Sequence, residues 1–349
     1  MTFAERLVAD WYAPRLTALT AAMLPLSVVY CGVVSLRRAL FKQAVLSSTR
    51  LPVPVVIAGN IAVGGTGKTP LVIALARALG GRGWHPGLLS RGYGARDEAV
   101  REVTQDAGAD DVGDEPLLLA RTGFPVFVGA KRAAAARALL AAHPRCDVLL
   151  CDDGLQHYAL DRDVEIVAVD STRGMGNGLV LPAGPLREPV SRLAGVDAIV
   201  LQGSGHVPRG SREFVMRLVG DRFVRVNDEG ITAGAEAFRS GSVHAVAGIG
   251  NPARFFADLR AHGITATCHA FPDHHRYSAA DLDFAGASAI LMTEKDAVKC
   301  KSFADDRFWS LPVEAIIDPA LIALVEEKVR GSKVARDTGV PRHQGSADL

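Results

Sequence analysis

The chain has 349 residues, of which 48% are apolar and 22% are charged, and its 39 basic and 38 acidic residues leave a net charge of +1. This length and balance are typical of a folded protein with more than one domain, and they exclude a largely disordered chain. The near-neutral charge also excludes a broad electrostatic attraction to nucleic acid, so any anion must be recognised by a local site.

The cysteines are scattered and show no C-x-x-C spacing. This pattern predicts reduced, mostly buried thiols in the cytosol rather than a disulfide framework or a zinc site. The residues concerned are Cys31, Cys146, Cys151, Cys268 and Cys300.

The first expected element is an apolar helix. Between Arg15 and Arg37 lie 21 residues without a charge, LTALTAAMLPLSVVYCGVVSL, close to the length that spans a bilayer. A cleaved signal peptide, a spanning helix and a buried core helix are all alternatives. Basic residues flank both ends of the segment, which favours a helix lying in the headgroup region. We therefore predict that residues 1–48 dock peripherally on a membrane from the cytosolic side.

From residue 49 to 212, short apolar runs alternate with amphipathic stretches. The runs are too continuous for half-exposed strands, and they predict buried parallel strands. They cover residues 54–60, 85–90, 124–129, 146–151, 164–170 and 196–202, with helices expected over 69–80 and 131–143. The pattern predicts a doubly wound α/β domain that binds ligands at the carboxyl ends of its strands.

Residues 213–330 repeat the alternation on a smaller scale. The stretch 213–227 predicts a strand pair that links the two units. Further strands are expected over 242–250, 264–271 and 288–294, and a helix from Pro252 to His262. We predict a second, smaller α/β domain, followed over 331–349 by a polar, disordered tail.

The stretch GNIAVGGTGKTP (59–70) lies between a predicted strand and a predicted helix. It departs from the usual P-loop spelling, G-x-x-x-x-G-K-[ST], because Ala62 stands where the first glycine is expected. The phosphate-binding groups are nevertheless present: backbone N–H groups at a helix N-terminus, a lysine for the β and γ oxygens and a hydroxyl for Mg²⁺. A glycine-rich turn without a ligand is the alternative. We predict a site for ATP and Mg²⁺ formed by Gly64, Gly65, Thr66, Gly67, Lys68 and Thr69.

A P-loop site also needs an acidic residue at the end of a neighbouring strand. The run CDVLLCDDGLQH (146–157) supplies Asp152 and Asp153, which would repel each other strongly without a cation. We expect this pair to hold Mg²⁺ directly or through water; capping of the next helix is the alternative. Gln156 and His157 in the same loop are candidates for orienting substrate or phosphate.

A kinase also needs a group that accepts the proton of the attacking hydroxyl. Candidates lie in GDEP (113–116) and FPDHH (271–275), both expected in loops. Asp114 paired with His274 would form a dyad in which the histidine can gain or lose a proton near neutral pH. Spacing alone equally allows helix capping by Asp114 and a surface position for His274.

Eight motifs follow one another through nearly the whole chain: VGGTGKTP (63–70), SRGYG (90–94), GDEP (113–116), DDGLQH (152–157), LPAGPLREP (181–189), GIGNPARFF (248–256), FPDHH (271–275) and TEKDAVK (293–299). Together they resemble the tetraacyldisaccharide 4'-kinase family of lipid A biosynthesis. The resemblance implies two α/β domains joined by a strand-pair hinge, with the P-loop in the larger one.

The resemblance also implies an activity and a location. Members of this family transfer the γ-phosphoryl of MgATP to the 4'-hydroxyl of a tetraacylated glucosamine disaccharide 1-phosphate, giving lipid IVA. The expected partners are therefore this lipid and the inner-membrane surface, with a monotopic or peripheral enzyme on the cytoplasmic face. No nucleic acid and no obligate protein partner are expected.

Residue roles carry over by motif. Lys68 and Thr69 are implied to bind phosphates and metal, and Asp114 resembles the catalytic base, assisted by the first histidine of PDHH, His274, rather than by His275. Arg91 and Tyr93 are expected to face substrate or nucleotide, with a turn-forming role as the alternative. The family's inner groups around Mg²⁺ and the reacting atoms correspond to Asp152, Asp153, Gln156, His157, Arg187 and Glu188, of which Glu188 is a candidate metal ligand and Arg187 a candidate substrate contact.

Two other classes of protein compete with a lipid kinase. A membrane-associated switch ATPase of the partitioning type carries the loop K-G-G-x-G-K-[ST], whose first lysine crosses a dimer interface. Val63 occupies that position here, and this class does not account for PDHH or TEKDAVK. A nucleotide-binding module without chemistry would bind MgATP and consume none with any lipid.

Overall fold

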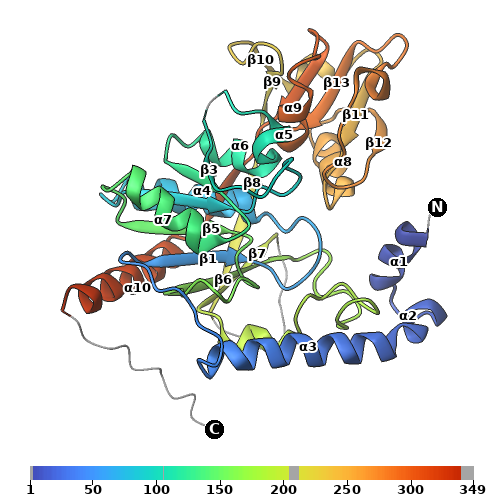
Figure 1. Cartoon of the computed structure of the whole chain (residues 1–349). Helices are drawn as coiled ribbons and strands as arrows, with labels where there is room; N and C mark the ends of the chain where they lie inside the picture. Colours follow the sequence, from blue (N-terminus) through green and yellow to red (C-terminus); the bar gives the residue numbers. More distant parts are fainter. Residues whose placement is uncertain (1–2, 105, 204–211, 339–349) are drawn as a thin grey trace.

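The computed structural model describes residues 3–104, 106–203 and 212–338. Within these ranges the strands form two sheets, one of nine strands and one of six. The longest of the N-terminal helices lies along the outside of the first sheet, and the two shorter ones lie beyond its end (Figure 1). The predicted fold class, a doubly wound parallel sheet with a second, smaller α/β sheet, is confirmed.

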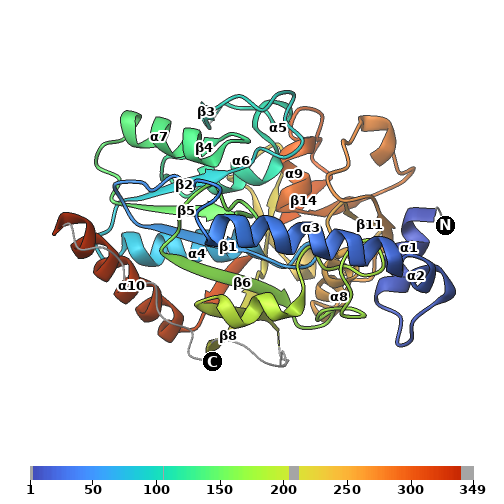
Figure 2. The same ribbon diagram turned by 60° about the horizontal axis from the view of Figure 1, so that its bottom comes forward.

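The N-terminal helices are α1 (Phe3–Trp11), α2 (Ala18–Ala22) and α3 (Leu24–Lys42). Pro25 lies in the first turn of α3, where proline is tolerated, so it begins this helix instead of interrupting a longer one. Among the described residues, α3 is the one helix that is long and apolar enough to cross a membrane. It nevertheless runs flat across the outside of the molecule (Figure 2). Its inner face is fixed by the Ser27 hydroxyl, which donates to Val180 O at 2.9 Å.

The first sheet has the strand order β15-β8-β7-β6-β1-β5-β2-β4-β3. All neighbouring pairs are parallel except the two at the ends, β15 with β8 and β3 with β4. The strands are β1 (Val55–Gly59), β2 (Pro86–Ser90), β3 (Arg101–Glu102), β4 (Val126–Val128), β5 (Val148–Asp152), β6 (Val164–Asp170), β7 (Ala198–Gln202), β8 (Arg212–Val219) and β15 (Glu314–Ile317).

Helices cover both faces of this sheet, which is why its central strands are continuously apolar. On one face lie α4, α6 and α10, and on the other α7 and the inner side of α3. In α4 the fully buried Leu71, Leu75 and Leu79 recur every four residues and form the stripe that packs on the strands. The helices are α4 (Lys68–Gly80), α5 (Ala109–Val112), α6 (Asp114–Ala120), α7 (Arg132–Ala142), the 3₁₀ helix η1 (Val190–Gly195) and α10 (Pro319–Asp337).

The second sheet has the order β10-β9-β14-β13-β11-β12, with β14, β13, β11 and β12 parallel. Its two faces carry separate apolar cores, one under α8 and one under α9. The elements are β9 (Arg222–Arg225), β10 (Thr232–Gly234), η2 (Ala235–Phe238), β11 (Val243–Ala247), α8 (Pro252–Ala261), β12 (Thr267–Ala270), η3 (Ala279–Leu282), β13 (Ala289–Thr293), α9 (Glu294–Cys300) and β14 (Phe308–Leu311).

The connection between the sheets differs from the predicted strand pair. Strands β8 and β9 follow each other in the chain but belong to different sheets, where they pair with β15 and β14. The chain therefore leaves the first sheet after Val219 and returns to it at Glu314. The predicted boundary at residue 212 and the assignment of all of 213–330 to the second domain are wrong, because β8, β15 and α10 pack with the first sheet.

The first part of the predicted disordered tail is helical. Helix α10 continues through residues 331–337, and residues 339–349 lie outside the described part. The last turn is fixed by Arg336, whose guanidinium donates to both carboxylate oxygens of Asp163 at 2.9 and 2.8 Å and to Leu51 O. The polar composition of this segment does not predict a buried bidentate ion pair.

We expect Arg336→Met to destabilise the protein by about 3 kcal/mol, because it removes the guanidinium partner of a fully buried carboxylate. Lys328→Met on the same helix is the control, since its pair with Asp197 is much more exposed and should contribute less than about 1 kcal/mol. Urea unfolding followed by circular dichroism gives both values. Equal values for the two variants would contradict the anchoring role.

Candidate active site

The candidate site lies where loops at the carboxyl ends of the parallel strands of both sheets meet. The P-loop (residues 60–67) leaves β1 and enters α4 with Gly67 as its N-cap, as the sequence predicts. Gly64 and Gly67 have φ values of +106° and +77°, a region that favours glycine. The backbone N–H groups at the start of α4 therefore line an anion-binding turn despite Ala62.

The two predicted acids lie at the end of β5, opposite this turn. Thr69 Oγ1 donates to Asp152 Oδ2 at 2.7 Å. Lys68 Nζ lies 3.4 Å from Asp153 Oδ1, and Arg187 NH1 donates to both oxygens of Asp153 at 3.1 Å. The structure thus brings together Lys68, Thr69, the acid pair and Arg187.

The adjacent carboxylates differ in charge. Burial, followed by repulsion from Glu115, raises the pKa of Asp152 to about 7. Burial acts in the same direction on Asp153, but the cations Lys68 and Arg187 outweigh it and lower the pKa of Asp153 to about 2. Opposed shifts in neighbouring acids are typical of a reaction site.

These groups fit a Mg²⁺ ion that is shared with a nucleotide. Among the described side chains, Asp152 Oδ1 and Thr66 Oγ1 are buried without a hydrogen-bond partner. The described part of the chain contains no group of three or more His, Cys, Asp or Glu side chains that could hold a metal ion by themselves. Mg²⁺ commonly takes one or two protein oxygens and completes its shell with phosphate and water, so Asp152 and Thr69 are suitable donors.

Asp114 and His274 form the predicted pair across the two domains. Asp114 begins α6 and is 4% exposed. His274 Nδ1 lies 3.2 and 3.1 Å from the two Asp114 carboxylate oxygens. Of the two consecutive histidines it is therefore His274 that meets Asp114, whereas His275 Nε2 lies 3.7 Å from Asp281.

Several neighbours keep Asp114 ionised. Its burial alone would raise the pKa of the carboxyl group, but the hydrogen bond from His274 and the charge of Lys295 outweigh burial and lower that pKa. The Lys299 ammonium, 3.9 Å from Asp114 Oδ2, acts in the same direction. A buried anion that can accept a proton therefore lies at the boundary between the domains.

Glu188 differs from the predicted metal ligand. Its oxygens accept hydrogen bonds from Gln156 Nε2 at 2.9 Å and from Tyr158 Oη at 2.5 Å, and Arg192 Nε lies 3.4 Å away. Both Glu188 oxygens accept hydrogen bonds and the residue is 1% exposed, so Glu188 supports the loop of Gln156. Gln156 Nε2 also donates to Asn60 O, which ties this loop to the start of the P-loop.

The remaining candidates are less closely grouped. Tyr93 is 57% exposed and lies against the His274 ring at a centroid distance of 4.6 Å. Arg91 instead lies on the surface, where its NH2 is 3.8 Å from Glu98 Oε1, and it reaches the site only through its charge, which helps to lower the pKa of His157. Burial, followed by the charges of Arg132, Arg162 and other arginines, lowers the pKa of His157 to about 4, so it is neutral near pH 7.

Sequence reasoning missed a set of contacts that join the domains beside the P-loop. Arg173 NH1 donates to Gly250 O at 2.5 Å. Asp170, at the end of β6, accepts from Asn251 Nδ2 at 2.9 Å and from Arg254 NH2 at 3.1 Å. The motif GIGNPARFF contains three of these residues and was the available signal, but it did not specify their partners.

Two further residues were missed. Arg132, 2% exposed at the start of α7, donates to Gly129 O at 2.9 Å and to Asp152 O at 3.5 Å, which fixes the backbone of the acid pair. Lys295, in TEKDAVK, lies 3.1 Å from Glu115 Oε1 and 3.3 Å from His274 Nε2. Sequence alone does not distinguish such lysines and arginines from solvated ones.

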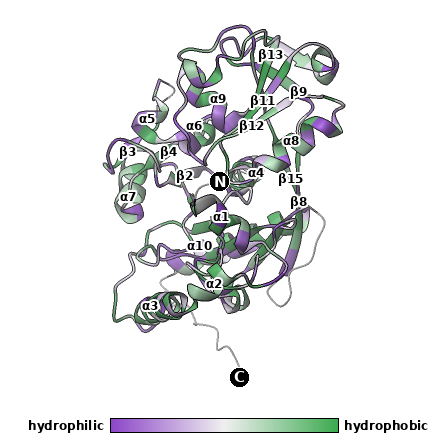
Figure 3. Cartoon of the chain, turned by 90° about the vertical axis from the view of Figure 1, so that its right-hand side faces the viewer, coloured by the Kyte–Doolittle hydropathy of each residue, from purple (hydrophilic) through white to green (hydrophobic). Residues whose placement is uncertain are grey.

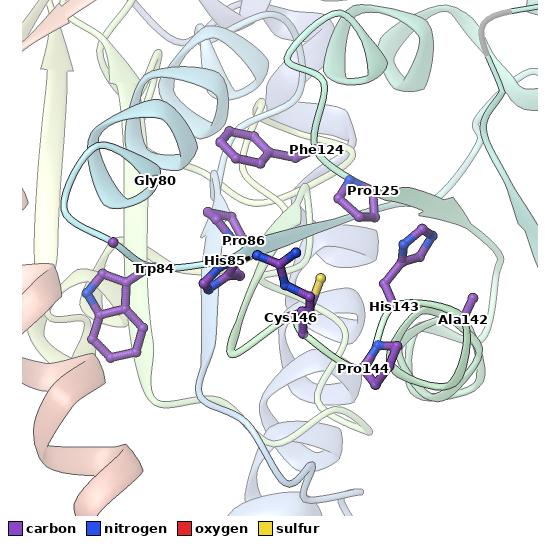
Figure 4. Close-up of a pocket in the computed structure, with 12 residues that line it drawn as sticks. Gly80, Trp84, His85, Pro86, Phe124, Pro125, Ala142, His143, Pro144 and Cys146 are labelled. Carbon is purple, nitrogen blue, oxygen red and sulfur yellow. Dashed lines mark hydrogen bonds between the residues drawn. The ribbon is translucent and has the colours of Figure 1, made fainter.

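A separate open cavity of about 820 Å³ lies at the opposite edge of the first sheet. Its walls include Trp84, Pro86, Phe124 and Pro125, which surround the amino ends of β2 and β4 (Figure 4). Gly80, at the far end of α4 from Lys68, also lines it. The cavity is therefore no part of the nucleotide site.

Comparisons with known proteins identify the family of this chain. A family model described as tetraacyldisaccharide-1-P 4'-kinase matches residues 19–330. The tetraacyldisaccharide 4'-kinase of Dechloromonas aromatica (strain RCB) is 54% identical over 317 residues, covering 90% of this chain and 93% of that protein. The enzyme of the same name from Azoarcus sp. (strain BH72) is 52% identical over 310 residues, covering 88% and 91%.

A solved structure is also similar. The crystal structure of LpxK from Aquifex aeolicus in complex with ATP superposes with a TM-score of 0.75 at 27% identity. The match covers 89% of this chain and 99% of that one.

The raised pKa of Asp152 predicts a pH-dependent stability. Its folded-state pKa of about 7 lies above the ordinary value of 3.8, so between these values the folded protein binds more protons than the unfolded chain. Without Mg²⁺, the stability contributed by this group therefore falls as the pH rises from about 4 to about 7. We expect wild type to lose roughly 2 kcal/mol relative to Asp152→Asn between pH 5 and pH 8.

Urea unfolding at both pH values, with and without Mg²⁺, measures this difference. Mg²⁺ should restore wild type at pH 8 and leave Asp152→Asn unchanged, because the cation compensates the buried charge. A wild-type curve parallel to that of the variant would contradict the prediction.

Proposed function

This chain belongs to the tetraacyldisaccharide-1-phosphate 4'-kinase family, and from that premise we propose how its own residues carry out the ATP-dependent phosphorylation of the lipid A precursor. The reaction joins the γ-phosphoryl of ATP to the 4'-hydroxyl of tetraacyldisaccharide 1-phosphate and gives lipid IVA. The observation that carries the residue assignment is the buried Asp114 carboxylate, hydrogen-bonded by His274 from the other domain.

The P-loop binds the transferring phosphate. Gly64, Gly65 and Gly67 allow the backbone to turn closely around the phosphates, and the N–H groups of Lys68 and Thr69 point toward them from the start of α4. The Lys68 ammonium, which here pairs with Asp153, turns to the β and γ oxygens when nucleotide binds. Arg187 remains paired with Asp153 and balances the negative charge of that carboxylate.

Mg²⁺ when bound neutralises the charge that develops on the phosphate oxygens. Thr69 Oγ1 and Asp152 would hold it, directly or through water. The unpartnered Asp152 Oδ1 and the raised pKa of that carboxyl group support this assignment. Asp153 and Glu188 are not proposed to bind the metal directly, because their oxygens already have cationic or hydrogen-bonding partners.

Asp114 acts as the base. As the 4'-oxygen forms its bond to the γ-phosphorus, the hydroxyl proton passes to Asp114, and the bond from phosphorus to the β,γ-bridging oxygen breaks to release ADP. His274 holds the Asp114 carboxylate in place through Nδ1. Tyr93, Gln156 and His157 are proposed to contact the sugar. Arg91 is proposed to contact the substrate only at the periphery of the site.

Helix α3 is proposed to attach the protein peripherally to the cytoplasmic face of the inner membrane. Leu26, Val29, Val33 and Leu36 recur at helical spacing and are 58 to 65% exposed, which forms one continuous apolar stripe. Viewed along its axis, α3 lies at the outer edge of the molecule (Figure 3). The opposite side is held by hydrogen bonds, so a helix lying in the interface fits better than a spanning one.

The same helix touches the loops of the site. Arg37 NH1 donates to Gln156 O at 3.0 Å, and Tyr30 Oη donates to Arg187 O at 3.2 Å. A tetraacyl lipid leaves the bilayer reluctantly, since each buried CH₂ contributes about 0.8 kcal/mol. The proposed docking face therefore brings the site to the lipid, and it requires no protein partner or nucleic acid.

We expect Asp114→Asn to lower kcat by roughly 10²- to 10⁴-fold while the Kd for MgATP changes less than about threefold, because the carboxylate acts on the proton and not on the phosphates. Transfer of label from γ-labelled ATP to tetraacyldisaccharide 1-phosphate in detergent micelles gives the rate. His275→Gln is the matched control, since this neighbouring histidine does not contact Asp114.

Lys68→Ala should lose both transfer and tight nucleotide binding. Near-normal transfer by Asp114→Asn would refute the base assignment. Hydrolysis of ATP by wild type without labelled lipid would favour the partitioning-type switch ATPase.

We expect the double substitution Val29→Ser and Val33→Ser to weaken binding to anionic phospholipid vesicles by about tenfold or more, because it removes apolar surface from the docking stripe. Substitution is preferable to deletion of α3, whose inner side packs on the first domain. The control replaces Val215 and Val219, which are 49% and 44% exposed on β8. Equal vesicle sedimentation of both variants would contradict docking through α3.

A further inference from the structure

Lys295 lies at the centre of the contact between the domains. It is the second residue of α9, and its side chain is 16% exposed. Its Nζ lies 3.1 Å from Glu115 Oε1, 3.2 Å from Asp273 Oδ1 and 3.3 Å from His274 Nε2. An ammonium group has three N–H bonds and no lone pair, so these three acceptors occupy all of its donors.

The side chain of Lys295 is protonated and positively charged. Burial alone would lower its pKa, but Glu115, Asp114 and Asp273 outweigh burial and raise the pKa above the ordinary value. Because the ammonium group can only donate, a hydrogen bond at this 3.3 Å contact requires His274 Nε2 to be the acceptor, without a proton. In the neutral ring the proton is then on Nδ1, where it is donated to Asp114.

We propose that Lys295 is a positioning residue for the phosphoryl transfer, which holds His274 as the neutral Nδ1–H tautomer and thereby keeps Asp114 free to accept the hydroxyl proton. This inference rests on the proposed roles of Asp114 and His274. A protonated ring would present Nε2–H to the ammonium at 3.3 Å, an unfavourable contact between like charges. The added positive charge would also lower the proton affinity of the Asp114 carboxylate.

The arrangement assigns different tasks to the two members of the dyad. With Nε2 directed at Lys295 and Nδ1 already protonated, His274 has no free lone pair for the substrate hydroxyl. Asp114 therefore takes the proton, and His274 orients it. Because Lys295 belongs to the second domain and Glu115 to the first, this arrangement forms only when the domains meet.

A simple salt bridge between domains is the competing explanation. The same two helices supply a matched example: Arg121, after α6, donates to Glu294 on α9 at 2.9 Å and to Glu229 at 2.8 Å. Neither contact involves the dyad. Several charged or titratable groups surround His274, and the interpretation of any pH profile must take them into account. They are Asp114 and Glu115 on α6, Tyr93, Asp273 on the loop of His274, and Lys295 and Lys299 on α9.

Nitrogen-15 NMR of histidine-labelled protein tests the tautomer without any turnover. The His274 signals are assigned by their loss in His274→Gln. We expect wild type at pH 7 to give a protonated Nδ1 and an unprotonated Nε2, and Lys295→Met to give a ring protonated at both nitrogens. A wild-type ring with its proton on Nε2 would overturn the proposal.

The pH dependence of kcat/KM tests the consequence for catalysis. In Lys295→Met we expect at least a tenfold loss at pH 7, with recovery to within about threefold of wild type near pH 9, because the acid limb moves up by about one pH unit or more. Arg121→Met should lower the rate, if at all, by the same factor at every pH.

The outcomes separate the two levels of inference. A uniform loss in Lys295→Met, like that of Arg121→Met, would reduce Lys295 to an interdomain salt bridge and overturn the proposal while leaving Asp114 as the base. Full activity of Asp114→Asn would instead overturn the proposed dyad itself, whatever the behaviour of Lys295.

Discussion

The site depends on a close approach between two backbones. The Gly250 backbone, after β11, lies against Gly65 in the P-loop so tightly that a Cβ on Gly250 would collide with Gly65 N. Arg173 binds Gly250 O and holds this contact in place. Since both segments follow parallel strands, the carboxyl edges of the two sheets must face each other. That orientation brings His274 and Lys295 to Asp114.

The structure compensates its buried carboxylates in different ways. Asp153 and Asp114 have permanent cationic or hydrogen-bonding partners, and each pKa is lowered. Asp152 accepts a hydrogen bond from the Thr69 hydroxyl, but burial and the charge of Glu115 outweigh this bond and the charge of Lys68, so its pKa is raised. A carboxyl group whose charge is incompletely compensated in the folded chain is suited to a ligand that brings a further positive charge. This contrast supports the proposal that Asp152, rather than Asp153 or Asp114, contributes to binding a cation.

Much of the fold could be predicted from the sequence, because strands buried on both faces are continuous apolar runs and the P-loop has a local signature. The return of β15 and α10 to the first sheet could not be predicted, because apolar residues such as Ile317 and Leu321 could pack equally well against either core. Lys68, Thr69 and Asp152 follow from local pattern. The pairing of Asp114 with His274 joins residues 160 positions apart; residue chemistry raised it as one candidate, and the resemblance to the family favoured it. The role of Lys295 depends on geometry alone.

Helix α3 lies flat and is hydrogen-bonded to the same loops that carry Gln156 and Arg187. An enzyme attached to a bilayer through this helix, as we propose, would search for its substrate in two dimensions. Its rate then depends on the mole fraction of substrate within the lipid surface and on lateral diffusion, rather than on bulk concentration. Diluting the substrate with inert lipid would slow such an enzyme even when the total amount of substrate in the suspension is constant.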